Sequence, residues 1–316
     1  MARNIVKALG LTTVLLACLT SASQDLAPRA YLITPVGSNA LTLNAAFYNG
    51  ELLFNSVVPI TDATARISVQ TLTYYRSLSF FGRSANITAT VPYGLGTFEG
   101  NVMEEKTSAY RSGMLDSVYR FSVNLKGGPA MSLEQFRSWQ QKFIIGASVR
   151  VVAPTGQYDS TKLINCGSNR WAFKPELGVS KRRGHWILDA YTGVWFYTTN
   201  PKFFSENAYF SGTRSQSQKP ILSFEGHFSY DVKPRLWVSL DGNYWHGGRT
   251  SVNGVENPDT LQSNSRIGAT ASIPLSRHQS VKVSYNYGAH IRFGGNYHNV
   301  SVAWQYSWIG RVLPSF

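Results

Sequence analysis

Apolar and polar residues alternate with a period of two along most of the chain after residue 38. In the segment 83–93, Ile87 and Ala89 share one face, and Asn86 and Thr88 share the opposite face. This pattern is typical of a strand with lipid on one side and a polar lumen on the other. We expect strands at about residues 39–49, 65–79, 83–93, 113–126, 141–153, 168–181, 184–199, 219–232, 234–247, 263–275, 278–292 and 297–308.

The connections between these segments are alternately short and long. Short turns follow Phe81, Lys181, Asp231 and Pro274, whereas long polar stretches occupy residues 94–111, 198–218 and 247–264. Outer-membrane barrels have tight turns on the periplasmic side and long loops outside. The sequence therefore predicts an all-β protein, a transmembrane antiparallel up-and-down β-barrel of about 12 strands over residues 39–308. Both termini then lie in the periplasm, and the location is the outer membrane of a Gram-negative bacterium.

Three local features modify this pattern. Residues 126–140 are too long for a tight turn, and Ser132 can cap a short interfacial helix over residues 133–139. Pro175 interrupts a strand, and since proline cannot donate to the ladder we expect a bulge or a strand end there. Aromatic residues near strand ends suit the membrane interfaces, and the sequence places there Trp171, Trp186, Phe196, Tyr197, Tyr244, Trp245, Tyr306 and Trp308.

The N-terminus has the pattern of a secretory signal peptide over residues 1–23. Arg3 and Lys7 precede the apolar run 8–19, which is too short to span a membrane, and small residues follow it. Cys18 matches a lipoprotein cleavage site poorly, so we expect ordinary cleavage. Cys166 is then the only cysteine of the mature chain, and an internal disulfide is excluded.

The segment 24–38 mixes Pro28 and Pro35 with apolar residues such as Tyr31. It is either a loose leader into the barrel or a periplasmic plug that narrows the mouth, and we predict the plug. Residues 309–316 form a C-terminal tail beyond the last strand.

Charged residues at inward positions are the candidate channel-lining residues. The bases lie on one set of strands and the acids on another, so opposite charges would face each other across the lumen. The alternative is that they pair directly and fill the interior. The set comprises Arg120, Arg150, Arg170, Lys174, Glu176, Asp189, Glu225, His227, Asp241, Arg266 and Lys282.

Catalysis, cofactors and nucleic acid receive no support from sequence motifs. The six histidines are scattered without metal-ligand spacing, and no nucleophile elbow or phosphate loop occurs. An outer-membrane lipid-modifying enzyme with serine, histidine and asparagine on adjacent strands stays an alternative. The net charge of +13 is spread over turns, lumen and loops, which favours contact with outer-membrane lipids over a nucleic-acid partner.

Several segments resemble one known family. They include residues 34–39, 154–159, 163–176, 247–250 and 303–306, and the likeness covers nearly the whole mature chain. The family is the outer-membrane group named "putative MetA-pathway of phenol degradation". The resemblance implies a transporter-like barrel linked to aromatic or other hydrophobic compounds. We expect a monomeric channel, inserted by the outer-membrane insertion machinery, for passive uptake of a small aromatic or amphipathic solute. A plugged structural barrel is the alternative.

Overall fold

A computed structural model describes residues 27–53, 60–102, 105–207 and 210–311 of the chain. The predicted signal peptide lies outside these residues, as does most of the predicted C-terminal tail. No helix in this part of the chain is long and apolar enough to cross a membrane.

The strands form a closed antiparallel β-barrel with 12 strand positions, as the alternation predicts. The wall consists of β1 (Ser38–Leu53), β2 (Ile60–Phe80), β3 (Arg83–Val102), β4 (Glu105–Met114), β5 (Ser117–Lys126), β6 (Phe143–Ala153), β7 (Ala172–Arg183), β8 (Trp186–Tyr197), β10 (Ile221–Lys233), β11 (Leu236–Gly247), β14 (Gln262–Pro274), β15 (Gln279–Ile291) and β16 (Gly294–Ile309). β1 pairs with both β2 and β16 and so closes the ring. β4 and β5 pair with successive parts of β3 and share one position.

The two faces of the wall differ as the sequence predicts. Large apolar side chains such as Phe47, Leu177 and Leu240 are exposed on the outer face, where lipid would surround them. Stacked rings such as Trp186 and Phe228 also lie outside. Trp245 and Tyr197 were expected among the interface aromatics, but Trp245 is 4% exposed and both rings pack in one cluster inside the barrel. Near strand ends, composition alone cannot assign the face, because an inward ring is as compatible with a strand as an outward one.

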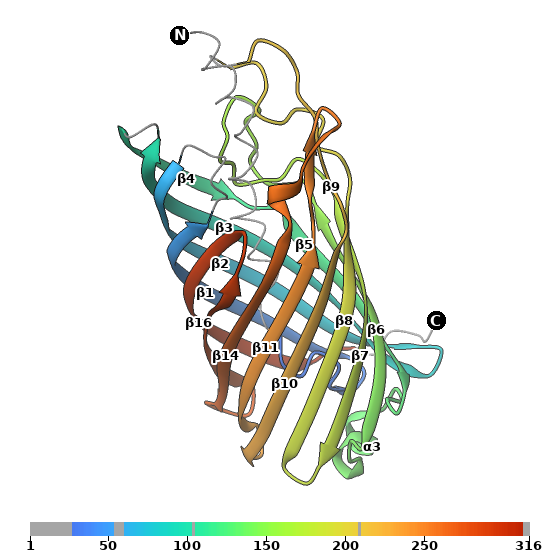
Figure 1. Ribbon diagram of the computed structural model, residues 1–316. Coiled ribbons are helices and arrows are strands. Elements are labelled where there is room, and N and C mark those ends of the chain that lie inside the picture. Colours follow the sequence, from blue (N-terminus) through green and yellow to red (C-terminus); the bar gives the residue numbers. More distant parts are fainter. Residues whose placement is uncertain (1–26, 54–59, 103–104, 208–209, 312–316) are drawn as a thin grey trace.

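The short turns all lie at one end of the barrel, which is the lower end in Figure 1. The longest of these connections contains α3 (Leu133–Ser138), whose N-terminus is capped by Ser132. Ser132 and Gln135 form a reciprocal capping box, which confirms the predicted helix. The bulge or strand end expected at Pro175 was wrong. β7 pairs with β6 through Pro175, and only its pairing with β8 is interrupted, resuming in the same register.

The opposite end carries longer structures. The segment 94–111 was expected to be a loop, but β3 and β4 continue through it as a hairpin that projects from the barrel (Figure 1). Polar residues predict a loop only where no partner strand is available, and here each strand pairs with the other. Above the other side, β9 (Gln216–Gln218), β12 (Thr250–Val252) and β13 (Val255–Asn257) form a separate small sheet, followed by the 3-10 helix η2 (Pro258–Thr260).

Three buried apolar clusters occupy the interior. One lies on β1–β3 and β16, where Ile67 and Phe98 pack with Ile164 from the loop after β6. A second, near α3, joins Tyr31 and Ile33 to Ile144 of β6 and Tyr191 of β8. The third lies on β8, β10 and β11 and contains Trp195, Ile221 and Trp245. Each cluster brings a non-strand segment or an aromatic ring into the lumen, so packed side chains occupy part of the interior.

Candidate functional site: the barrel lumen

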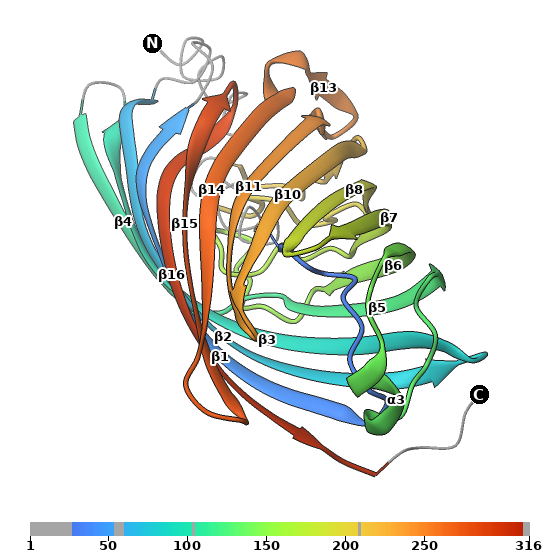
Figure 2. The same cartoon turned by 90° about the horizontal axis from the view of Figure 1, so that it is seen from below.

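Residues 27–37, which we call the lumenal strap, enter the barrel before the first strand. Viewed from the side of the short turns, this segment crosses the inside of the ring near α3 (Figure 2). Its end is fixed to the periplasmic connections, where the Val36 N–H donates to the carbonyl of Met131 at 2.8 Å. At Thr34, Oγ1 hydrogen-bonds Tyr75 Oη at 2.7 Å.

Tyr31 is the centre of the strap and is 1% exposed. Its ring lies in a slot between Gly146 of β6 and Gly178 of β7, which face each other in register. A Cβ on either glycine would stand 2.1 Å from a ring carbon of Tyr31. The phenol donates to Glu176 Oε1 at 3.0 Å and contacts Ser148 Oγ at 3.1 Å. The two glycines therefore provide the space that the strap occupies.

Arg29 holds the other end of the strap. Its guanidinium pairs with Asp231 at 2.7 Å and stacks over Trp237 at 4.3 Å. The backbone N–H groups of Arg29 and Ala30 donate to Asp189 Oδ2 and Tyr191 Oη. Asp189, one of the candidate channel-lining residues, thus accepts a hydrogen bond from the strap.

The predicted basic and acidic sectors are not separate. Lys174 Nζ lies 2.8 Å from both Glu176 and Glu225, and Arg120 lies 3.7 Å from Glu176. The expectation that opposite charges face each other across the lumen is therefore wrong for these four residues. Arg120 is on β5, Lys174 and Glu176 are on β7, and Glu225 is on β10. The ion pairs therefore lie within one strand or two strand positions apart, and long side chains close them along the wall. Arg120 also contacts the strap, since its guanidinium lies 5.0 Å from the centroid of the Tyr31 ring.

His227 and Asp241 form a second polar group on β10 and β11. They are cross-strand neighbours, and His227 Nδ1 lies 2.9 Å from Asp241 Oδ1. Asp241 also accepts from Ser239 at 2.8 Å and from Thr270 at 2.7 Å. His227 is 1% exposed, and its Nε2 lacks a hydrogen-bond partner within the described residues. This histidine is held by the Asp241 carboxylate, and its Nε2 is buried 3.9 Å from Glu225 Oε2.

The remaining candidates occupy different positions on the inner face. Arg170 and Arg266 are buried, at 8% and 2% exposure, and each lies over an aromatic ring. Arg150 is half-buried beside Arg120 and Lys174 in the strand register. Lys282 is exposed, on the same face of β15 as the buried Asn286. The structure thus groups most of the set on β5–β11, with Arg266 and Lys282 farther around the wall.

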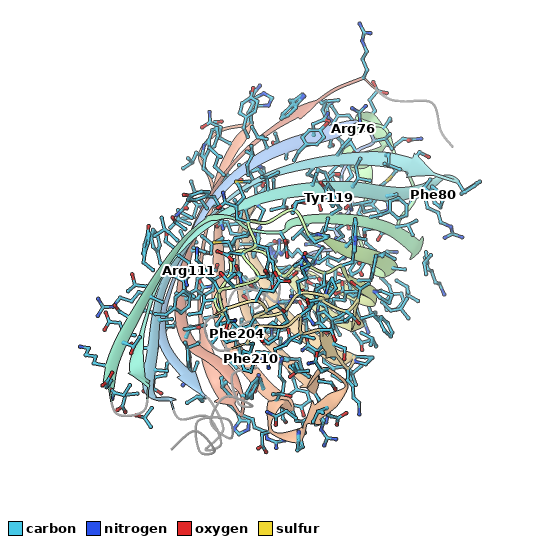
Figure 3. The ribbon with its side chains drawn as sticks, turned by 90° about the horizontal axis from the view of Figure 1, so that it is seen from above. Arg76, Phe80, Arg111, Tyr119, Phe204 and Phe210 are labelled. Atoms are coloured by element: carbon cyan, nitrogen blue, oxygen red, sulfur yellow. The ribbon has the colours of Figure 1, made fainter. Side chains whose placement is uncertain are left out.

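The loop between β8 and β10 covers part of the opposite mouth. Phe204 and Phe210 lie within the outline of the barrel viewed from above (Figure 3). Their ring centroids are 5.8 Å apart, and Arg214 stacks over Phe210 at 3.9 Å. Burial lowers the pKa of the Arg214 guanidinium. The mouth is therefore lined by rings and one buried cation.

Several lumen residues were not among the predicted site residues. Gly146 was placed on the polar face of its strand but without a role, and Gly178 and Trp195 lie at inward positions that the alternation itself could have revealed. Glycine at a core-facing strand position marks a close approach of another segment. The described residues contain no group of histidine, cysteine or acidic side chains suited to hold a metal ion.

Comparison with solved structures agrees with this architecture. The crystal structure of the COG4313 outer membrane channel from Pseudomonas putida F1 has a TM-score of 0.76 at 17% identity, over 90% of this chain and all (100%) of that one. The β-domain of the Bordetella autotransporter BrkA has a TM-score of 0.51 at 11% identity, over 86% of this chain and 100% of that one. No curated protein matches the sequence significantly.

The barrel is of the outer-membrane type, and the protein resides in the outer membrane of a Gram-negative bacterium. The family described as "Putative MetA-pathway of phenol degradation" matches residues 54–300, which is well over half of the 316 residues. The chain belongs to this family.

Proposed function

We propose that the protein is a channel for passive passage of small amphipathic or aromatic molecules, with the lumenal strap as the constriction on the periplasmic side. The observation that carries this proposal is the strap itself. It crosses the inside of the barrel and continues into the wall only through β1, so it can leave without breaking the wall. A plug made of strand side chains could not.

The family and the likeness to an outer-membrane channel support a transport role. Membrane lipids surround the apolar outer face, and the solute is the partner inside. Assembly by the outer-membrane insertion machinery as a monomer fits a single closed barrel whose strands all pair within one chain.

Flux into liposomes tests this function. Purified full-length protein is reconstituted, and entry of a small aromatic alcohol and of a small sugar is compared with entry into protein-free vesicles. We expect faster entry of the aromatic alcohol. Equal rates with and without protein, for every solute, would refute the channel.

Lipid hydrolysis is a second candidate because one outward pair has suitable residue types. His246 of β11 and Ser263 of β14 are cross-strand neighbours on the outer face. Tyr244 Oη lies 3.1 Å from Ser263 Oγ and 3.5 Å from His246 Nδ1, so the phenol bridges the two side chains. We favour the channel, since no carboxylate or amide side chain of the described residues hydrogen-bonds this histidine to orient it. Phospholipase activity that disappears in Ser263→Ala would favour the enzyme.

A further inference from the structure

The wall of the lumen away from the strap carries a shelf of aromatic side chains. The aromatic shelf consists of Trp195 and Tyr197 of β8 and Trp245 of β11, which pack with Ile221 and Ala172. The rings of Trp195 and Tyr197 are stacked, with centroids 6.4 Å apart and planes 15° apart. Trp195 and Trp245 are 2% and 4% exposed, so their faces are withdrawn from bulk water.

Three cations lie over these rings. Arg170 is 4.6 Å from the Tyr197 centroid, Arg266 is 5.5 Å from Trp245, and Lys174 is 5.8 Å from Trp195. Ring faces attract cations, which explains the placement. The shelf therefore combines flat apolar surfaces with positive charge at its two ends and along its edge.

The two arginines differ from Lys174 in their charge balance. Lys174 is neutralised by Glu176 and Glu225 at 2.8 Å each. Within the described part of the chain, neither Arg170 nor Arg266 forms an ion pair with an acid within 4.0 Å. Arg170 Nη2 donates to Gln218 at 2.5 Å, and Arg266 Nη2 donates to the Gly295 carbonyl at 3.3 Å.

Both guanidiniums keep unused donors. Arg170 Nη1 and Arg266 Nε are buried and have no hydrogen-bond partner among the described residues. A buried charge without a partner is costly, so this arrangement is stabilised when an anion or ordered water reaches it. Each arginine therefore offers one unpartnered nitrogen to a carboxylate oxygen, and such a charge-assisted hydrogen bond is stronger than a neutral one.

We propose that the aromatic shelf, with Arg170 and Arg266, binds aromatic carboxylates during passage, so that the solutes of the channel include aromatic acid anions. Because cations cover the ring faces, the ring of such a solute displaces a guanidinium from its place over the shelf, and its carboxylate accepts a hydrogen bond from that guanidinium. A neutral aromatic solute leaves the donors unmatched, and a simple anion leaves the ring faces unused. This inference rests on the proposed channel function.

Current block in planar bilayers tests the inference. Single-channel current through the full-length protein is recorded in potassium chloride with benzoate, benzyl alcohol or acetate added as the probe. We expect benzoate to interrupt the current at concentrations at least about tenfold lower than either of the others, because only benzoate uses both features. Arg170→Gln and Arg266→Gln should each weaken the benzoate block by about tenfold or more, as expected when a charged hydrogen bond is lost.

Two variants provide controls. Arg83→Gln removes an exposed arginine from a periplasmic turn and should leave the block unchanged. Arg170→Lys keeps the charge but not the planar fork, and we expect an intermediate block. If Arg170→Gln does not insert into the bilayer, Arg170→Lys tests the same site in its place.

The outcomes separate the two proposals. Absence of any current in the wild type contradicts the channel. A normal current that benzoate and acetate block equally, or that stays equally sensitive to benzoate in the arginine variants, overturns the aromatic-acid site alone. Calorimetric titration of the wild type in detergent is the second readout, and equal heats for benzoate and acetate would also overturn the site.

Discussion

Adding one methyl group at Gly178 should release the strap. In Gly178→Ala the new Cβ would stand 2.1 Å from Tyr31 Cε2 and 2.8 Å from Tyr191 Cδ1. Ordinary contact requires at least 3.4 Å, so the Tyr31 ring must move by more than 1 Å. β7 is paired with a strand on each side, so its backbone cannot move away easily. The strap continues into the wall through β1 and is otherwise held only by non-covalent contacts, so it can move.

The displaced ring loses identifiable interactions. Tyr31 Oη gives up its hydrogen bonds to Glu176 and Ser148, and the edge-to-face contact with Tyr191 at 5.2 Å is broken. A hydrogen bond to a charged group contributes about 1.5–3 kcal/mol, a neutral one about 1 kcal/mol, and an aromatic pair about 0.5–1.5 kcal/mol. The total of about 3–5 kcal/mol corresponds to more than a hundredfold change in strap occupancy.

Trypsin cleavage after Arg29 measures this release, because the Arg29 side chain is 7% exposed while paired with Asp231. Detergent-solubilised Gly178→Ala should be cut at Arg29 much faster than the wild type, and its single-channel conductance should be higher. Gly226→Ala is the matched control, since its Cβ would meet no atom within 4 Å. A folded Gly178→Ala protein with wild-type cleavage and conductance would refute the slot.

Three further predictions concern the anchors, the charged wall and the outer loop. Asp231→Asn removes the partner of Arg29 and of Arg182, so trypsin should cut at Arg29 faster than in the wild type, and an unchanged rate would contradict the anchor. Lys174→Met leaves Glu176 and Glu225 buried without their shared cation, so it should lower the free energy of unfolding, measured by urea titration, by about 3–5 kcal/mol. Lys181→Met, on the exposed surface, should not lower it, and equal urea midpoints for the two variants would refute the pairing. Hydrogen bonds from Thr161 and Lys162 lower the pKa of Asp159 to about 2, so their stabilisation is present above the usual carboxyl pKa and is lost as the pH falls through about 2. Amide exchange in residues 159–165, corrected for intrinsic rates, should therefore be alike at pH 7 and pH 4, and loss of protection between these values would contradict the shifted pKa.

The sequence predicted the wall well because a strand between lipid and lumen must alternate. The face on which each side chain lies follows from this rule, so the twelve strand positions and the inward direction of Glu225 and His227 could be predicted from the alternation alone. The capped helix near Ser132 was predictable from local chemistry.

Partners across the lumen could not be predicted in this way. Alternation states that Lys174 and Glu176 point inward, but not that Lys174 reaches Glu225 two strands away along the wall. The slot for Tyr31 depends on two glycines that are far apart in sequence and meet through strand register. Trp245 has the same phase as Asp241 and Asn243, so the alternation of β11 places it inward. It was expected at the interface only because it is an aromatic residue near a strand end.

The most direct test of the account is the single-channel conductance of the wild type and of a variant that lacks residues 24–36, recorded under identical conditions. Heat-dependent migration on gels confirms that the variant has folded as a barrel. We expect a measurable wild-type conductance and a clearly larger one in the deletion variant, because the strap is removed while the wall stays closed. Equal conductance in a correctly inserted deletion protein would contradict the constriction, and no conductance in either protein would contradict the channel.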